Sequence, residues 1–187
     1  MTHCKYPDCK KPVKVSGYCG PHYSAQRTAQ LSLVEARQED KAPPPIEDWH
    51  CVYVIGCAEL APIKVGRSTN VISRISQIQG GCPYMLRLYE AFFAPPNVVK
   101  WLEWDVKWKL HDFDLGTKEH LNTEWFLVAP EDAAAVIRKC AELKDFRIYS
   151  AQEFEQVAMT QKGEVRPEWI EHIGTINFMA NGITPGS

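Results

Sequence analysis

Residues 51–66 read CVYVIGCAELAPIKVG, two apolar segments joined by a short loop. The first segment, 51–56, is rich in β-branched residues and ends at Gly56, and the second spans 63–66. β-branched and aromatic residues favour strands, and two such segments around a short loop are typical of a hairpin. We therefore predict an antiparallel pair of strands here.

A helix is predicted after the hairpin. Asn70 is a helix-capping residue type, apolar positions recur at helical spacing from Val71 to Ile78, and Gly80-Gly81 ends the pattern. The same reasoning predicts a strand over 86–93, a helix over 97–113, a short strand over 124–128, and helices over 131–143 and 151–159 before an irregular tail. The predicted fold class is α+β, a small antiparallel sheet flanked by helices.

A possible metal site lies near the N-terminus. Its residues have the spacing C-x4-C-x9-C-x2-H and are Cys4, Cys9, Cys19 and His22. Three thiolates and one imidazole complete a tetrahedral zinc shell. A disulfide framework or scattered core thiols are the alternatives, but the compact, polar spacing favours structural zinc. The remaining cysteines have no paired ligand spacing and are interpreted as buried free thiols: Cys51, Cys57, Cys82 and Cys140.

The composition allows one main core. With 187 residues, 45% hydrophobic and 24% charged, the chain can bury one core plus a small accessory module. We predict a zinc finger with a helix over 1–40, the helix itself spanning 23–39, and a linker over 41–49 that Pro43-Pro44-Pro45 keeps extended. A main domain over 50–149 and an unassigned extension over 150–187 follow.

The distribution of charge says more about partners than the net charge of −2. Residues 1–30 carry five basic residues against one acid, and residues 60–89 carry four basic residues and no acid. Two basic patches indicate local contact with phosphates, although a solvated face is the ordinary explanation for individual lysines. No secretory signal or membrane-spanning run is apparent, so we expect a cytosolic protein with reduced thiols.

Residues 50–143 resemble the GIY-YIG nuclease superfamily, in particular its divergent branch found in many phage proteins. The motifs, in chain order, are Val52-Tyr53-Val54-Ile55, Lys64-Val65-Gly66-Arg67-Ser68, Arg74, Trp101-Leu102-Glu103-Trp104, Leu110-His111 and Glu124-Trp125-Phe126. In the wider superfamily Gly-Ile precedes the first tyrosine, and a second tyrosine stands at the position of Lys64. Here Cys51-Val52 and a lysine take those places, and the divergent branch has the same changes. The N-terminal module resembles the small zinc fingers that accompany phage nucleases.

The resemblance implies an endonuclease that hydrolyses DNA with Mg²⁺ or Mn²⁺, in the host cytoplasm if a phage encodes it. Glu103 stands where the family holds its ion, which would stabilise the phosphate and the leaving oxygen. Arg67 and Arg74 would hold the scissile phosphate, because a guanidinium bonds two phosphate oxygens at once. The zinc finger would add DNA affinity or position the cut.

Two further candidates follow from the same resemblance. Tyr53 would orient or deprotonate the attacking water, and Lys64 and the arginines would favour its phenolate, unless Lys64 simply contacts phosphate. His111 is a catalytic candidate through its place in the Leu-His motif. We expect five of these side chains to converge in one cleft at the sheet edge: Tyr53, Lys64, Arg67, Arg74 and Glu103.

Each assignment has an ordinary alternative. Tyr53 is equally interpreted as a core aromatic with its hydroxyl bonded to backbone. Glu103 has Lys107 one helical turn on and can pair with it. His111 is more often a core or surface histidine, whereas Glu124 can support the site by hydrogen bonding. Two other functions stay open: an inactive DNA-binding protein of the same fold, and an interaction protein whose finger grips a host protein, as in inhibition of a defence system.

Overall fold

The structure is a computed structural model that describes residues 3–5, 9–13, 18–39, 48–57, 62–116, 124–160 and 167–180. The α-helices in these residues are α1 (Gly20–Glu39), α2 (Val71–Gln79), α3 (Pro96–Lys109), α4 (Pro130–Glu142), α5 (Ala151–Thr160) and α6 (Pro167–Ala180). The strands are β1 (His50–Cys57), β2 (Ile63–Ser68), β3 (Leu86–Ala94), β4 (Trp125–Phe126) and β5 (Tyr149–Ser150), and the 3₁₀-helix η2 spans His111–Phe113.

The strands form one antiparallel sheet with the order β4-β2-β1-β3-β5. The predicted hairpin is confirmed, because β1 pairs with β2 so that Tyr53 faces Gly66 and Val54 faces Val65. β4 pairs with β2 at Ile63 and at the residue that follows it, which leaves the end of β2 beyond Gly66 without a strand on its outer side in the described residues.

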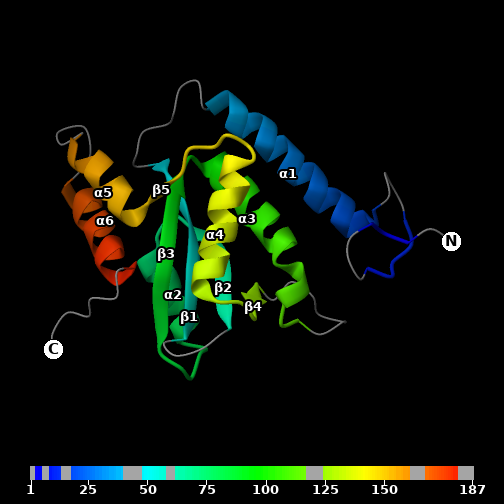
Figure 1. Ribbon diagram of the computed structural model, residues 1–187, viewed down its shortest axis with the longest axis horizontal. Helices are drawn as coiled ribbons and strands as arrows, with labels where there is room; N and C mark the ends of the chain where they lie inside the picture. Colours follow the sequence, from blue (N-terminus) through cyan, green and yellow to red (C-terminus); the bar gives the residue numbers. More distant parts are fainter. Residues whose placement is uncertain are drawn as a thin grey trace.

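Side chains alternate between the two faces of the sheet, as the strand period of two requires. Val52, Val54 and Val65 pack in a buried core beneath α1, α3 and α4. Tyr53 and Ile55 pack in a second core beneath α2, α5 and α6. Figure 1 shows the resulting three layers, with α1, α3 and α4 on one face of the sheet and α5 and α6 across it. The α+β prediction is confirmed.

Helix α1 connects the N-terminal cluster to the main core. It begins at Gly20, three residues before the predicted start, and it packs against α3. Ala29 is only 4% exposed and belongs to the core beneath α3, with Leu33 packed against it. Figure 1 shows α1 and α3 side by side along most of their length. The helix next to the finger is therefore docked on the sheet module.

The structure departs from the sequence prediction at the C-terminus. The irregular tail is wrong for residues 167–180, which form α6 and bury Ile173 and Ile176 against α5 and β3. The two-residue strand β5 was not predicted, and the helix predicted over 97–113 ends at Lys109 before η2. Pro43-Pro44-Pro45 of the predicted linker lies outside the described residues. No described helix is long and apolar enough to span a membrane.

Candidate active site and metal centre

The predicted zinc ligands come together at the N-terminal end of α1. The ligand atoms of Cys4, Cys9, Cys19 and His22 all lie within 4.8 Å of one another. The Cys9 and Cys19 sulfurs are 3.8 Å apart, and His22 Nδ1 lies 3.3 Å from the Cys4 sulfur and 3.4 Å from the Cys19 sulfur. A tetrahedral ion with Zn–S and Zn–N bonds of about 2.3 and 2.0 Å requires separations of about 3.8 and 3.5 Å. These residues fit zinc.

Local backbone structure orders this cluster. The amide of Cys19 donates to the Cys4 sulfur over 3.2 Å, and the amide of Cys4 donates to the carbonyl of Lys11 over 3.1 Å. The carbonyl of Cys19 accepts from Tyr23 over 2.9 Å, so Cys19 starts the helix that carries His22. Two of the four ligands are thus fixed to α1.

On the α2 face of the sheet, Tyr53 and Arg74 form a pair across β2. Tyr53 lies on the central strand opposite Gly66, and a Cβ added to Gly66 would come 2.4 Å from the Tyr53 hydroxyl. The tyrosine ring therefore lies over the glycine and extends toward the outer side of β2. There, Arg74 Nε donates to the Tyr53 hydroxyl over 3.4 Å. Helix α2, capped by the Asn70 side chain, holds Arg74 in place.

The environment of Tyr53 keeps it protonated. Burial raises the pKa of Tyr53, and the hydrogen bond and charge of Arg74 only partly oppose this. Arg74 thus favours the phenolate as expected, but burial outweighs it, and Lys64 is not among the causes of the shift. At neutral pH the neutral phenol is a hydrogen-bonding group, and it is not a base.

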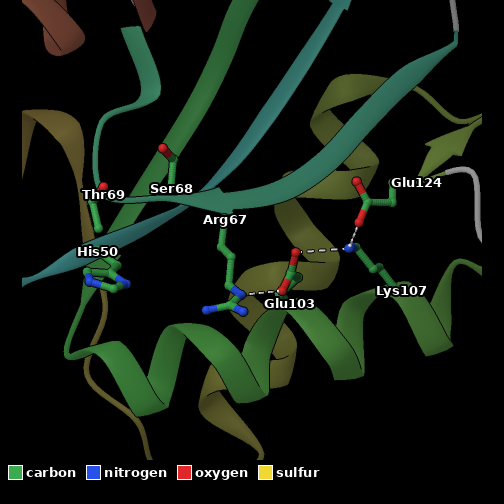
Figure 2. Close-up of a pocket in the computed structure, with 7 residues that line it drawn as sticks. All are labelled: His50, Arg67, Ser68, Thr69, Glu103, Lys107 and Glu124. Carbon is green, nitrogen blue, oxygen red and sulfur yellow. Dashed lines mark hydrogen bonds and ion pairs between the residues drawn. The ribbon is translucent and has the colours of Figure 1, made fainter. Parts of the chain in front are cut away.

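On the opposite face, a pocket of about 400 Å³ opens between the outer end of β2 and α3. Figure 2 shows the side chains that surround it. They are His50, Arg67, Ser68, Thr69, Glu103, Lys107 and Glu124. Because alternate residues of a strand point to opposite faces, Arg67 enters this pocket while its neighbour Gly66 lies beneath Tyr53.

Ion pairs run continuously through the pocket. Arg67 Nε lies 2.7 Å from Glu103 Oε2, and Lys107 Nζ lies 2.9 Å from Glu103 Oε1. The same ammonium lies 2.5 Å from Glu124 Oε1, and Lys64 Nζ lies 2.8 Å from Glu124 Oε2. The pairing of Glu103 with Lys107, expected as the ordinary alternative, is present. Glu124 accepts hydrogen bonds from Lys64 and Lys107, whereas its support of an active site stays a prediction. Figure 2 shows the series from Arg67 to Glu124.

Glu124 is held in an uncommon backbone conformation. Its φ is 65°, in the left-handed region that few non-glycine residues adopt, and its carbonyl accepts from the amide of Val65 over 3.2 Å. Burial raises the pKa of the Glu124 carboxyl, but hydrogen bonds from Lys107 and Lys64 outweigh burial and lower it overall. Glu124 is therefore ionised at neutral pH.

The two groups of side chains lie on opposite faces of the sheet, and their charges interact across β2. The pKa of Arg74 is raised mainly by the hydrogen bond to Tyr53, and further by the charges of Glu124 and Glu103, which act from the other group. Of the five side chains expected in one cleft, Arg67 and Glu103 line the pocket. Tyr53, Lys64 and Arg74 do not line it, so the expectation of a single cleft is wrong for these three. Their catalytic roles stay predictions.

Two other predicted site residues are placed differently. Lys64 is only 6% exposed, and its ammonium forms an ion pair with Glu124. The same ammonium lies 5.5 Å from the ring centre of Trp125. His111 is buried in η2, with Nδ1 3.5 Å from the carboxylate of Asp112, and it does not line the pocket. Its charge is among the causes, after burial and Lys11, that lower the pKa of His22. The predicted catalytic role of His111 therefore receives no geometric support.

Sequence reasoning missed several pocket residues. His50 is the first residue of β1, and its pKa is lowered by burial and then by the charge of Arg67. A neutral imidazole here can accept a proton or bond a phosphate. The alternation of side chains along a strand could have identified His50 from the sequence. His50 lies on the same face of β1 as Val52, and Val52 is the cross-strand partner of Arg67. Ser68 and Thr69, which end β2, were likewise missed.

The carboxylates suit a hard divalent cation by their chemistry, since Mg²⁺ and Mn²⁺ prefer oxygen ligands. Glu103 and Glu124 supply four oxygens at one side of the pocket, and each oxygen contacts an ammonium or guanidinium. The donor set fits, and an ion would take the place of one of these contacts.

These features define a class of protein: an α+β domain with a five-stranded antiparallel sheet in the described residues, and a Cys₃His cluster in front of it. Comparison with protein families identifies the domain. Residues 50–141 match the model of the T5orf172 domain, a family related to GIY-YIG, so this part of the chain is a T5orf172 domain. No curated protein and no solved structure matches the chain.

Proposed function

We propose that this protein is a metal-dependent DNA endonuclease of the GIY-YIG type, with a zinc finger that aids DNA binding. The T5orf172 domain supports a nuclease-related fold. The observation that carries the proposal is the pocket in which Arg67 is paired with Glu103, with the Tyr53–Arg74 hydrogen bond on the other face of the same strands. Phosphodiester hydrolysis needs cations on the phosphate and a carboxylate nearby.

The arginines are the phosphate-binding groups in this proposal. Arg67 has a side chain that is 42% exposed, and its terminal nitrogens extend away from the ion pair with Glu103 (Figure 2). Those nitrogens can bond two oxygens of one phosphate. Arg74 approaches the same edge from α2, so a phosphate at the end of β2 meets guanidinium groups from both faces of the sheet.

Tyr53 acts through Arg74 in this arrangement. The residue is 1% exposed, and its hydroxyl accepts from Arg74 Nε. The hydroxyl thereby fixes the direction of the guanidinium, which makes Tyr53 a positioning residue. His50, a neutral imidazole in the pocket, is the group that can accept a proton from water. A divalent ion held by Glu103 would stabilise the charge on the phosphate and on the departing oxygen.

The first test is cleavage of duplex, branched and single-stranded DNA by zinc-loaded protein, with Mg²⁺, with Mn²⁺ and with EDTA. We expect cleavage that requires the divalent ion, and Glu103→Gln should abolish it while DNA binding persists, because the carboxylate acts in the transition state. Equal absence of cleavage in wild type and Glu103→Gln on every DNA would favour the inactive DNA-binding alternative.

A second set of variants tests the residue roles. Arg74→Ala should lower kcat by about 10²–10³, the usual cost of one lost charge-stabilising donor. Tyr53→Phe should lower it less, because the guanidinium remains and loses only its orientation. Tyr89→Phe is the matched control: its hydroxyl donates to the Cys57 carbonyl over 2.7 Å, away from the pocket residues. A Tyr53→Phe enzyme as active as Tyr89→Phe would contradict the positioning role.

A further inference from the structure

The side chain of Lys107 lies between the two carboxylates of the pocket. Its ammonium is 2.9 Å from Glu103 Oε1 and 2.5 Å from Glu124 Oε1, and Figure 2 shows it joined to both. The outer oxygen of each carboxylate has a different partner, Arg67 for Glu103 and Lys64 for Glu124. Among the ion pairs of the described residues, Lys107 is the cation that bridges the two acids.

The position of this ammonium is one that a divalent ion would occupy. Mg²⁺ binds oxygen ligands at about 2.0–2.1 Å, so each of the two inner oxygens would have to move by less than about 1 Å to bind an ion at the nitrogen position. Both oxygens are hard ligands of the kind that Mg²⁺ and Mn²⁺ prefer. An ion and the ammonium cannot occupy this position together.

Both carboxylates are fixed by the fold. Glu103 and Lys107 stand one turn apart on α3, with side chains 18% and 22% exposed. Glu124 is held by its left-handed backbone and by the hydrogen bond from Val65 to its carbonyl. Two ionised carboxylates repel each other, and the charge of Lys107 between them offsets that repulsion. The ammonium therefore keeps the two acids together in the metal-free protein.

We propose that Lys107 is a built-in competitor of the divalent ion, which binds between Glu103 and Glu124 only when the ammonium leaves. This inference rests on the proposed function insofar as Glu103 is the ligand of the ion. A DNA phosphate in the pocket offers the displaced ammonium a new anionic partner. Ion binding and DNA binding are then cooperative, and the protein without DNA has low affinity for the ion.

The test is a titration of zinc-loaded protein with Mn²⁺, without DNA, followed by calorimetry or by the electron paramagnetic resonance of free Mn²⁺. Lys107→Met should bind Mn²⁺ at least about 10-fold more tightly than wild type, within the range usual for coupled ligands. Lys107→Arg, which keeps the charge, should stay close to wild type. Lys109→Met, which removes an exposed charge from the same helix, is the matched control and should also stay close.

A second comparison isolates Glu124 and DNA. Adding Glu124→Gln to Lys107→Met should cancel most of the gain in affinity. Short duplex DNA should tighten Mn²⁺ binding by wild type but not by Lys107→Met, because only wild type has an ammonium to move. Circular dichroism checks that each variant is folded, and Lys107→Gln replaces Lys107→Met if that variant unfolds.

Equal Mn²⁺ affinity in wild type and the neutral variants would overturn the inference, as would no measurable binding by any of them. These outcomes are separate from the cleavage result. An inactive wild type whose Lys107→Met variant binds Mn²⁺ more tightly refutes the nuclease proposal alone. An active wild type with unchanged affinities in the variants refutes the competitor alone.

Discussion

Tyr53 and Gly66 are cross-strand partners, and only a glycine at position 66 leaves room for the tyrosine ring. A methyl group at position 66 would lie 2.4 Å from the Tyr53 hydroxyl and 2.7 Å from its ring carbon Cζ. Contacts this short force the ring to move, and Tyr53 is buried, only 1% exposed, so the move disturbs its packing. The glycine therefore places the tyrosine hydroxyl beside Arg74.

Gly66→Ala should destabilise the protein by about 1–3 kcal/mol, the usual cost of inserting a group into a packed core. It should also lower cleavage, because displacement of Tyr53 removes the hydrogen bond to Arg74. Urea denaturation measures the first effect and the DNA assay the second. Gly81→Ala is the control, because the nearest atom to its added methyl is 3.8 Å away. Equal stability of the two variants would contradict the close packing.

The sequence motif predicted Arg67 and Glu103 as site residues, and the structure brings them into contact. The bridging role of Lys107 was not predictable, because it depends on how close the fold brings Glu124 to α3. The raised pKa of Tyr53 was also missed, since burial of a strand residue by helices distant in sequence decides it. Local patterns identify residue types, whereas contacts between distant segments set their electrostatics.

At the scale of elements, α5 begins with a reciprocal cap. The side-chain hydroxyl of Ser150 accepts from the Glu153 amide over 3.3 Å, and the Glu153 carboxylate accepts from the Ser150 amide over 2.8 Å. This is a capping box, and the residues Ser-Ala-Gln-Glu at 150–153 contain its signature. The cap starts the helix that packs Phe154 against the sheet.

Ser150→Ala should lower the free energy of unfolding by about 1 kcal/mol through loss of the cap. Hydrogen bonds from the Ser150 amide and hydroxyl lower the pKa of Glu153, so its stabilising effect is present above the ordinary pKa near 4.5 and is lost as pH falls through the lower folded value. The penalty of Glu153→Ala should therefore be larger at pH 7 than at pH 3 in urea denaturation. Gln152→Ala, an exposed change in the same turn, should show no such pH dependence.

Elements with a strong local pattern were predicted well, and those defined by long-range pairing were not. The hairpin and α2 carry their own periodicity, cap and terminating glycines, and both are confirmed. The strand β5 has two residues and exists through its pairing with Phe92 and Phe93 of β3. α6 shows apolar positions at 170, 173 and 176, but its stability comes from docking on α5 and β3. Such docking leaves a weak signal in sequence.

At the scale of the whole molecule, the zinc cluster and the sheet are joined through α1. Cys4→Ser combined with Cys9→Ser should abolish zinc binding, measured by elemental analysis, while Cys82→Ser keeps one zinc per chain. Loss of zinc should unfold mainly the finger, because a structural ion stabilises its own module. DNA affinity should fall and its salt dependence should flatten, because the lysines of the finger no longer displace counterions.

Deletion of residues 1–40 should have a further effect that the cysteine variant lacks. It removes α1 and uncovers the surface of α3 on which Ala29 packs, so the melting temperature of the remaining domain should drop. Thermal unfolding of both proteins measures the difference. Equal melting temperatures would show that α1 contributes nothing to the core. Unchanged DNA affinity in the cysteine variant would instead favour a protein partner for the finger.

The docking of α1 on α3 fixes the position of the zinc cluster relative to the pocket residues on α3. Glu103 lies six residues before the end of α3 at Lys109, about 9 Å at 1.5 Å per residue. α3 packs against α1, which begins one residue after the zinc ligand Cys19. If the protein binds and cuts DNA as proposed, two packed helices hold the finger and the pocket apart at a fixed separation, and the cut bond lies at a constant offset from the contact of the finger.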